Sequence, residues 1–174
     1  MAELTLVTTV GATDANSYGT LDEMNLYFTG RSDAVDFLQA TEQEQIARLV
    51  QATVINDLLL HAFGERATEE QSLEFPRNNL VDKHGRRYSN TDIPAKIKYA
   101  QFEQALYLFT SSIKLPSILM QGFSQARLDV MSVTVDKQFI PNKLDTDALD
   151  FLREFGIVDS GSVGNVHVAN VVRY

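Results

Sequence analysis

Apolar residues recur at helical spacing in several stretches of the chain. Met24, Tyr27 and Phe28 form a short stripe that Gly30 ends, and a longer stripe runs from Ile46 towards Gly64. A third stripe has members at i, i+3, i+4, i+7 and i+11, namely Phe102, Ala105, Leu106, Phe109 and Ile113. Each stripe would cover one face of a helix. The pattern therefore predicts a mainly α-helical protein.

Capping signals set where these helices begin. Thr20 and Thr41 each precede a glutamate by three residues, which is the form of a capping box. Pro94 suits the first turn of the third helix. Asp145 or Thr146 is expected to cap a last short helix whose inner face comprises Ala148, Leu149, Leu152 and Phe155. Gly156 is expected at the C′ position of that helix, with Ile157 as its hydrophobic contact.

Residues 126–139 change to the pattern of a β-hairpin, in which Leu128 and Val130, and then Val133 and Val135, alternate with polar residues. Residues 1–19 predict a short strand or an extended arm. Residues 159–174 are rich in glycine and serine and then in valine, so they are either an arm that orders on a partner by strand addition or a frayed end. The expected fold is a small helical bundle over residues 20–158 with a β-hairpin and extended N- and C-terminal arms.

The composition excludes several classes of protein and of functional site. The 174 residues fit one domain with arms, and the absence of cysteine excludes disulfides, thiolate catalysis and nearly all structural zinc sites. No apolar run is long enough to span a bilayer, and the first residues do not resemble a signal peptide, so no membrane contact is expected. A cytoplasmic origin fits the missing cysteines.

The net charge of −8 is unevenly distributed. Residues 1–70 carry twelve acidic and three basic residues, residues 71–144 six acidic and ten basic, and residues 145–174 five acidic and two basic. This uneven distribution is consistent with oppositely charged surfaces that meet in an assembly, and equally with charged side chains scattered in solvent. The overall negative charge argues against general binding to nucleic acid.

Catalytic chemistry has no candidate in the sequence. His61, His84 and His167 lie in an apolar helix end, a turn and the tail, and His61 is expected in a core or an interface. No zinc-binding helix motif, phosphate loop or nucleophile elbow is present. We therefore expect no enzyme activity, no metal and no cofactor.

The polar stretch 64–92 is long for a loop in a compact domain, which favours a functional role. Its candidate contact residues are Phe75, Arg77, Lys83, Arg86 and Arg87. Cations beside an aromatic side chain could bind single-stranded DNA. They could equally donate to carboxylates of a neighbouring subunit, which is favoured because acidic residues interleave with them.

Several short motifs, in their order and spacing, resemble a known family. They are Asp14-Ala15-Asn16-Ser17-Tyr18 with Leu21 and Tyr27-Phe28, then Phe75-Pro76-Arg77, Asp82-Lys83-His84-Gly85-Arg86 and Ile93-Pro94. The likeness is to head-to-tail connector (adaptor, or head-completion) proteins of tailed bacteriophages, many of which carry the label "DnaT-like single-stranded DNA-binding". It covers residues 4 to 158. Phe75 stands where that family usually has tryptophan.

This resemblance implies a structural protein of the virion neck, assembled in the host cytoplasm. The implied form is a homo-oligomeric, twelve-fold ring beneath the portal protein. The ring would join the next connector or tail protein and let genomic DNA pass without sequence-specific binding. Residues 75–87 are expected to contact a neighbouring subunit. The tail is expected to grip the portal through Val163, Val166, His167, Val168, Val171, Val172, Arg173 and Tyr174. Binding of single-stranded DNA remains the alternative function.

Overall fold

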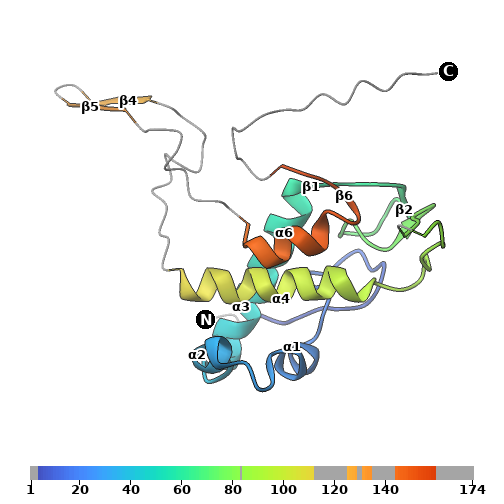
Figure 1. The fold of residues 1–174 in the computed structure, drawn as a ribbon, viewed down its shortest axis with the longest axis horizontal. Helices are drawn as coiled ribbons and strands as arrows, with labels where there is room; N and C mark the ends of the chain where they lie inside the picture. Colours follow the sequence, from blue (N-terminus) through green and yellow to red (C-terminus); the bar gives the residue numbers. More distant parts are fainter. Residues whose placement is uncertain (1–3, 83, 112–124, 129–130, 135–143, 160–174) are drawn as a thin grey trace. The chain divides into compact units, whose positions relative to one another are not determined.

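The computed structural model describes residues 4–82, 84–111, 125–128, 131–134 and 144–159. The chain divides into two compact units. The first comprises residues 1–113 and 143–160, and it holds all the helices described below (Figure 1). The described part of the second unit is a β-hairpin. The fold is therefore mainly α-helical with a hairpin, as the hydrophobic pattern predicts.

Two helices begin at the predicted capping boxes. α1 spans Leu21–Phe28, and its cap Thr20 accepts a hydrogen bond from the Glu23 N–H at 3.2 Å while the Glu23 carboxylate accepts from the Thr20 N–H at 2.9 Å. Thr41 and Glu44 form the same box at the start of α3, Glu42–Leu59. A short 3-10 turn, η1 at Ser32–Ala34, and the four-residue helix α2 at Val35–Leu38 join α1 to α3.

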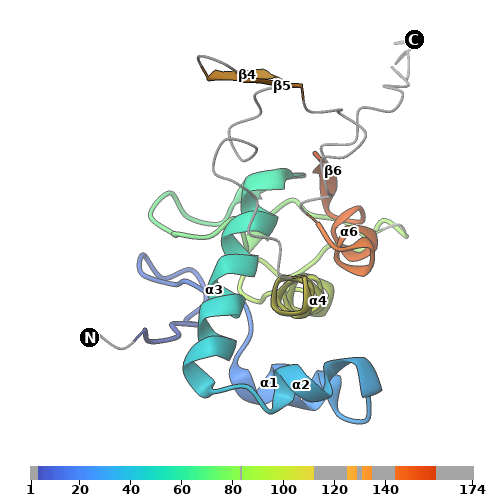
Figure 2. The same ribbon diagram turned by 90° about the vertical axis from the view of Figure 1, so that its left-hand side faces the viewer.

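Helix α4, Ala95–Thr110, is the centre of the domain. α3 runs across it, and α6, Thr146–Leu152, lies beside it (Figures 1 and 2). Its apolar stripe predicts one buried face. The structure also buries Gln101, Glu103 and Gln104, so the middle of α4 is enclosed on more than one side. Pro94 precedes α4 as its N-cap, and Asp145 caps α6 by accepting from the Asp147 N–H at 3.1 Å.

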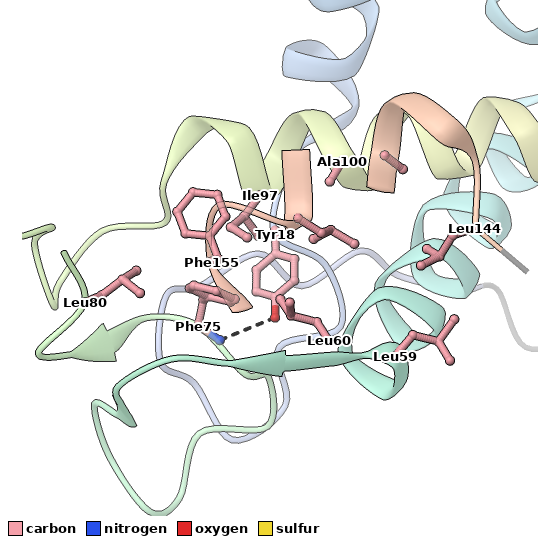
Figure 3. Close-up of a cluster of buried hydrophobic side chains, with 11 residues drawn as sticks. Tyr18, Leu59, Leu60, Phe75, Leu80, Ile97, Ala100, Leu144 and Phe155 are labelled. Carbon is pink, nitrogen blue, oxygen red and sulfur yellow. Dashed lines mark hydrogen bonds between the residues drawn. The ribbon is translucent and has the colours of Figure 1, made fainter. Parts of the chain in front are cut away.

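Two apolar clusters pack against α4. One lies between α1, α2, α3 and α4, and its buried members are Met24, Phe28, Ala34, Phe37, Leu49, Ala52, Phe102, Ala105 and Leu106. The other joins α4 to α6, to the end of α3 and to the loops around residues 18 and 75 (Figure 3). Its buried members are Tyr18, Leu59, Leu60, Phe75, Leu80, Ile97, Ala100, Leu144, Ala148, Leu152 and Phe155. α4 contributes to both clusters and so connects them.

The end of α3 differs from the sequence prediction. The apolar run predicts a helix as far as Gly64, but α3 ends at Leu59 and the chain continues as strand β1, Leu60–Ala62. β1 pairs antiparallel with β6, Gly156–Val158, a strand nearly a hundred residues later. The helical period cannot reveal this pairing, because its partner is remote in sequence.

The predicted role of Gly156 as a helix C′ residue is wrong. α6 ends at Leu152, and Gly156 instead opens β6 opposite Ala62. A Cβ atom at residue 156 would lie 2.3 Å from the His61 carbonyl oxygen, so the close approach of two strands requires glycine there. Ile157 is 67% exposed and is not the hydrophobic contact of a helix end.

The N-terminal segment lies against the helical domain instead of projecting from it. Asn16 accepts a hydrogen bond from the Val7 N–H at 2.8 Å, which closes a loop within the segment. The Gln101 side chain accepts from the Gly19 N–H at 3.0 Å and donates to the hydroxyls of Ser17 and Thr53 at 2.6 and 2.8 Å. A buried amide on α4 thereby ties residues 17–19 to α3 and α4.

Part of the polar stretch 64–92 forms short pairings of its own. β2, Glu65–Arg66, pairs antiparallel with β3, Arg77–Asn78. In the second unit, β4, Gln125–Leu128, pairs with β5, Met131–Thr134, and Leu128 lies opposite Met131. Residues 131 and 132 therefore belong to β5.

Candidate interaction surface

Phe75, predicted to contact a neighbouring subunit, lies in the core of its own domain. Its ring is buried, and it packs edge-on against Tyr18 and Phe155 with ring centroids 6.0 and 5.7 Å away (Figure 3). The Phe75 N–H also points to the Tyr18 hydroxyl, at 3.4 Å. The prediction is wrong for this residue, because a side chain that completes a core cannot reach a partner.

Arg77 is likewise internal, with 8% of the residue exposed. Its guanidinium donates to the carbonyl oxygens of Phe63 at 2.7 Å and Gly64 at 2.8 Å, and to the Glu74 carboxylate at 2.6 Å. It also reaches the Ala62 carbonyl at 3.2 Å. The planar fork thus connects the end of β1 to the start of β3. Its donors are used within the chain, which contradicts the predicted role in subunit or DNA contact.

The turn at residues 82–87 does present cations to solvent. The Asp82 carboxylate accepts hydrogen bonds from the N–H groups of His84 and Arg86 at 2.8 and 2.9 Å, and from the Arg86 guanidinium at 2.8 Å. These bonds lower the pKa of Asp82 to about 2, and the bond from the Arg86 backbone has the largest effect. Arg86 and Arg87 are exposed. Lys83, the remaining predicted contact, lies outside the described residues.

Two further cations between residues 71 and 144, Lys96 and Lys98, are paired within the chain. Lys96 pairs with Glu154, which also accepts a hydrogen bond from the Tyr88 hydroxyl at 2.7 Å. Lys98 pairs with Glu23 at 2.6 Å. Several cations of a stretch that is basic in sequence are therefore paired in space, and among the described residues Arg86, Arg87 and Lys96 are exposed.

The Asp14–Tyr18 motif holds the fold together. The Tyr18 hydroxyl donates to the Asp57 carboxylate of α3 at 2.5 Å, and the other oxygen of that carboxylate accepts from the Glu74 N–H at 3.1 Å. Three segments far apart in sequence meet at one carboxylate. Burial raises the pKa of Asp57 to about 6, although the hydrogen bonds from Tyr18 and Glu74 act in the opposite direction.

Large apolar side chains are exposed where α3 passes into β1. Val54 and Leu58, one helical turn apart, are 60% and 71% exposed. Ile157 lies on the adjoining β6 strand opposite His61, which is also exposed; of the two positions expected for His61, the core is therefore wrong and an interface stays a prediction. We call Val54, Leu58 and Ile157 the apolar end surface. Grouped exposed apolar residues are typical of surfaces that bind other proteins.

The predicted tail contacts lie outside the described residues. Over the part of the chain that the structure describes, no three histidine, aspartate or glutamate side chains gather as a metal site would require. Among those same residues, no helix has both the length and the hydropathy needed to cross a membrane.

Comparison with known proteins identifies a family. A family model described as "Putative DnaT-like ssDNA binding protein" matches residues 2–168. Since the match covers almost the whole chain, the protein belongs to this DnaT-like family. Searches of curated proteins and of solved structures found no match. Of the two functions considered, the family description supports binding of single-stranded DNA; it does not mention a phage connector.

Proposed function

We propose that this member of the DnaT-like family is a structural subunit of a tailed bacteriophage. It would form a homo-oligomeric ring beneath the portal and join head to tail in the virion neck. The observation that carries the proposal is the apolar end surface, where Val54, Leu58 and Ile157 are each exposed. We assign the protein to this assembly because the Asp14–Tyr18 and Asp82–Arg86 motifs resemble those of connector proteins.

The charges of the domain support protein contact over DNA contact. Four of the cations between residues 71 and 144 form ion pairs with carboxylates of the same chain, namely Arg77, Arg86, Lys96 and Lys98. Affinity for DNA comes mainly from unpaired cations that displace counterions from phosphates. The net charge of −8 opposes the same contact and suits a channel wall along which DNA must slide. The proposal includes no catalytic step and no cofactor.

The test uses charge substitutions on the apolar end surface. The double variant Leu58→Asp, Ile157→Asp should keep the circular dichroism of the native protein, because both side chains are exposed. It should lose self-association in analytical ultracentrifugation and ring formation on the purified portal of the same phage. Leu26→Asp is the matched control, since Leu26 is equally exposed but lies on α1. If the double variant assembles as the native chain does, this surface is not the contact.

The second candidate function is binding of single-stranded DNA. It is favoured by the family description and by the exposed pair Arg86 and Arg87 beside the Asp82 turn. Fluorescence anisotropy with a labelled oligothymidylate at low salt tests it. Salt-dependent binding that the Arg86→Ala, Arg87→Ala variant weakens would support this function. Absence of binding at low salt would remove it.

A further inference from the structure

A groove opens where the N-terminal segment crosses the first turns of α1 and α3. Its volume is about 340 Å³. The aliphatic side chains among those that line it are Leu4, Leu6, Leu21 and Ile46. Of the described residues that line the groove, Glu42 alone is charged. The groove is therefore apolar, with a single carboxylate beside it.

The walls of this groove are held in place by contacts within the chain. The Gln43 side chain accepts a hydrogen bond from the Leu4 N–H at 3.2 Å and donates to the Leu4 carbonyl at 3.4 Å, which ties the N-terminal segment to α3. Leu6 and Leu21 pack against the cluster between α1, α2, α3 and α4. Leu4 remains 41% exposed. The groove is thus a preformed site whose aliphatic lining is partly open to solvent.

The groove and the apolar end surface lie at opposite ends of α3. Glu42 is the first residue of this helix and Leu58 is its last but one. At a rise of about 1.5 Å per residue, roughly 24 Å separates these two positions along the helix axis. Figure 2 shows α3 running from the level of α1 and α2 to that of β6. Both faces belong to the first unit, so one helix fixes the distance between them.

A ring of identical subunits requires two different contact faces on every subunit. Its contacts are heterologous, so a patch on one subunit meets a different patch on the next. In a ring of many subunits the two patches lie on nearly opposite sides of each subunit, because successive copies are turned by only a small angle. The apolar end surface supplies one such face. The groove has the position and the apolar character that the other face needs.

We propose that the groove of one copy receives the apolar end surface of the next. The inference rests on the proposed ring and names the second half of its contact. Leu58 and Ile157 are 71% and 67% exposed, and both aliphatic side chains leave water when they enter an aliphatic groove. His61, exposed opposite Ile157, carries an imidazole N–H that can donate to the Glu42 carboxylate of the other copy. The contact is therefore head-to-tail, whereas a pairing of two end surfaces would close a dimer and leave the groove unused.

Mixing two blocked variants of the full-length chain tests this contact. Leu4→Asp places a carboxylate in the groove, and Leu58→Asp with Ile157→Asp places two on the end surface; these side chains are exposed, so circular dichroism should be unchanged. In analytical ultracentrifugation each variant alone should be monomeric. Their equimolar mixture should form heterodimers and nothing larger, because it holds one intact end surface and one intact groove. Leu26→Asp, on α1, is the matched control and should assemble as the native chain does.

Two outcomes would overturn this inference and leave the proposed ring in place. One is self-association of Leu4→Asp alone, which would show that the end surface does not need the groove. The other is a mixture that stays monomeric at concentrations where the native chain assembles. If the native chain forms no oligomer, either alone or on the purified portal, the proposed ring itself is refuted and this contact with it.

Discussion

Replacing Arg77 with alanine should destabilise the domain strongly. The guanidinium donates to the carbonyl oxygens of Ala62, Phe63 and Gly64 and to the Glu74 carboxylate, and only 8% of the residue is exposed. Removing one partner of a buried charge pair costs about 3–5 kcal/mol. Glu74 is one-third exposed and can regain water, so we expect a loss at the lower end, about 3 kcal/mol.

Urea denaturation followed by circular dichroism measures this loss. With a denaturant slope of about 1–3 kcal/mol/M, a loss of about 3 kcal/mol lowers the midpoint by at least about 1 M. Arg87→Ala is the matched control, because Arg87 is exposed and should change the stability by less than about 0.5 kcal/mol. Arg77→Lys should fall between them, since an ammonium group cannot reproduce the guanidinium fork. Equal midpoints for Arg77→Ala and Arg87→Ala would refute this account of Arg77.

Three further changes test the core and the central carboxylate. Phe75→Ala should cost about 3–5 kcal/mol in urea denaturation, because the ring is buried between Tyr18 and Phe155. Gly19→Ala should lower the thermal midpoint, since its Cβ would lie 2.5 Å from the Phe102 ring. The pKa of Asp57, raised to about 6, means that its stabilising contribution is present below pH 4 and is lost as the pH rises through 6. The native chain should therefore gain stability relative to Asp57→Asn as the pH falls from 7 to 4; a pH-independent difference would contradict the raised pKa.

The local signals in the sequence predict the helices well. The threonine–glutamate pairs at residues 20–23 and 41–44 are complete capping boxes, and Asp145 caps α6. These predictions succeed because caps and helical stripes depend on residues within one or two turns of each other. The hairpin is confirmed for the same reason, with its strands at residues 125–128 and 131–134.

The site predictions failed for side chains whose contact partners are far away in the sequence. Phe75 and Arg77 belong to a polar stretch without periodicity, and such a stretch normally indicates side chains that are exposed to solvent. Their partners are Tyr18, Phe155 and the carbonyl groups after β1, which no local pattern connects to residues 75–77. The exposure of Leu58 and Ile157 could not be predicted either, because each lies in a run of apolar residues, which is typical both of a core and of a contact with another subunit.

The sequence by itself determined the helical class, the helix starts and the uneven charge, since each depends on composition or near neighbours. Only the tertiary structure decided which charges remain exposed. Lys96 and Lys98 are neutralised by Glu154 and Glu23, and Arg77 is enclosed by backbone carbonyls. It also decided that β1 pairs with β6. The physical reason is that ion pairs and strand pairs join residues by their positions in space, which the order of residues along the chain does not specify.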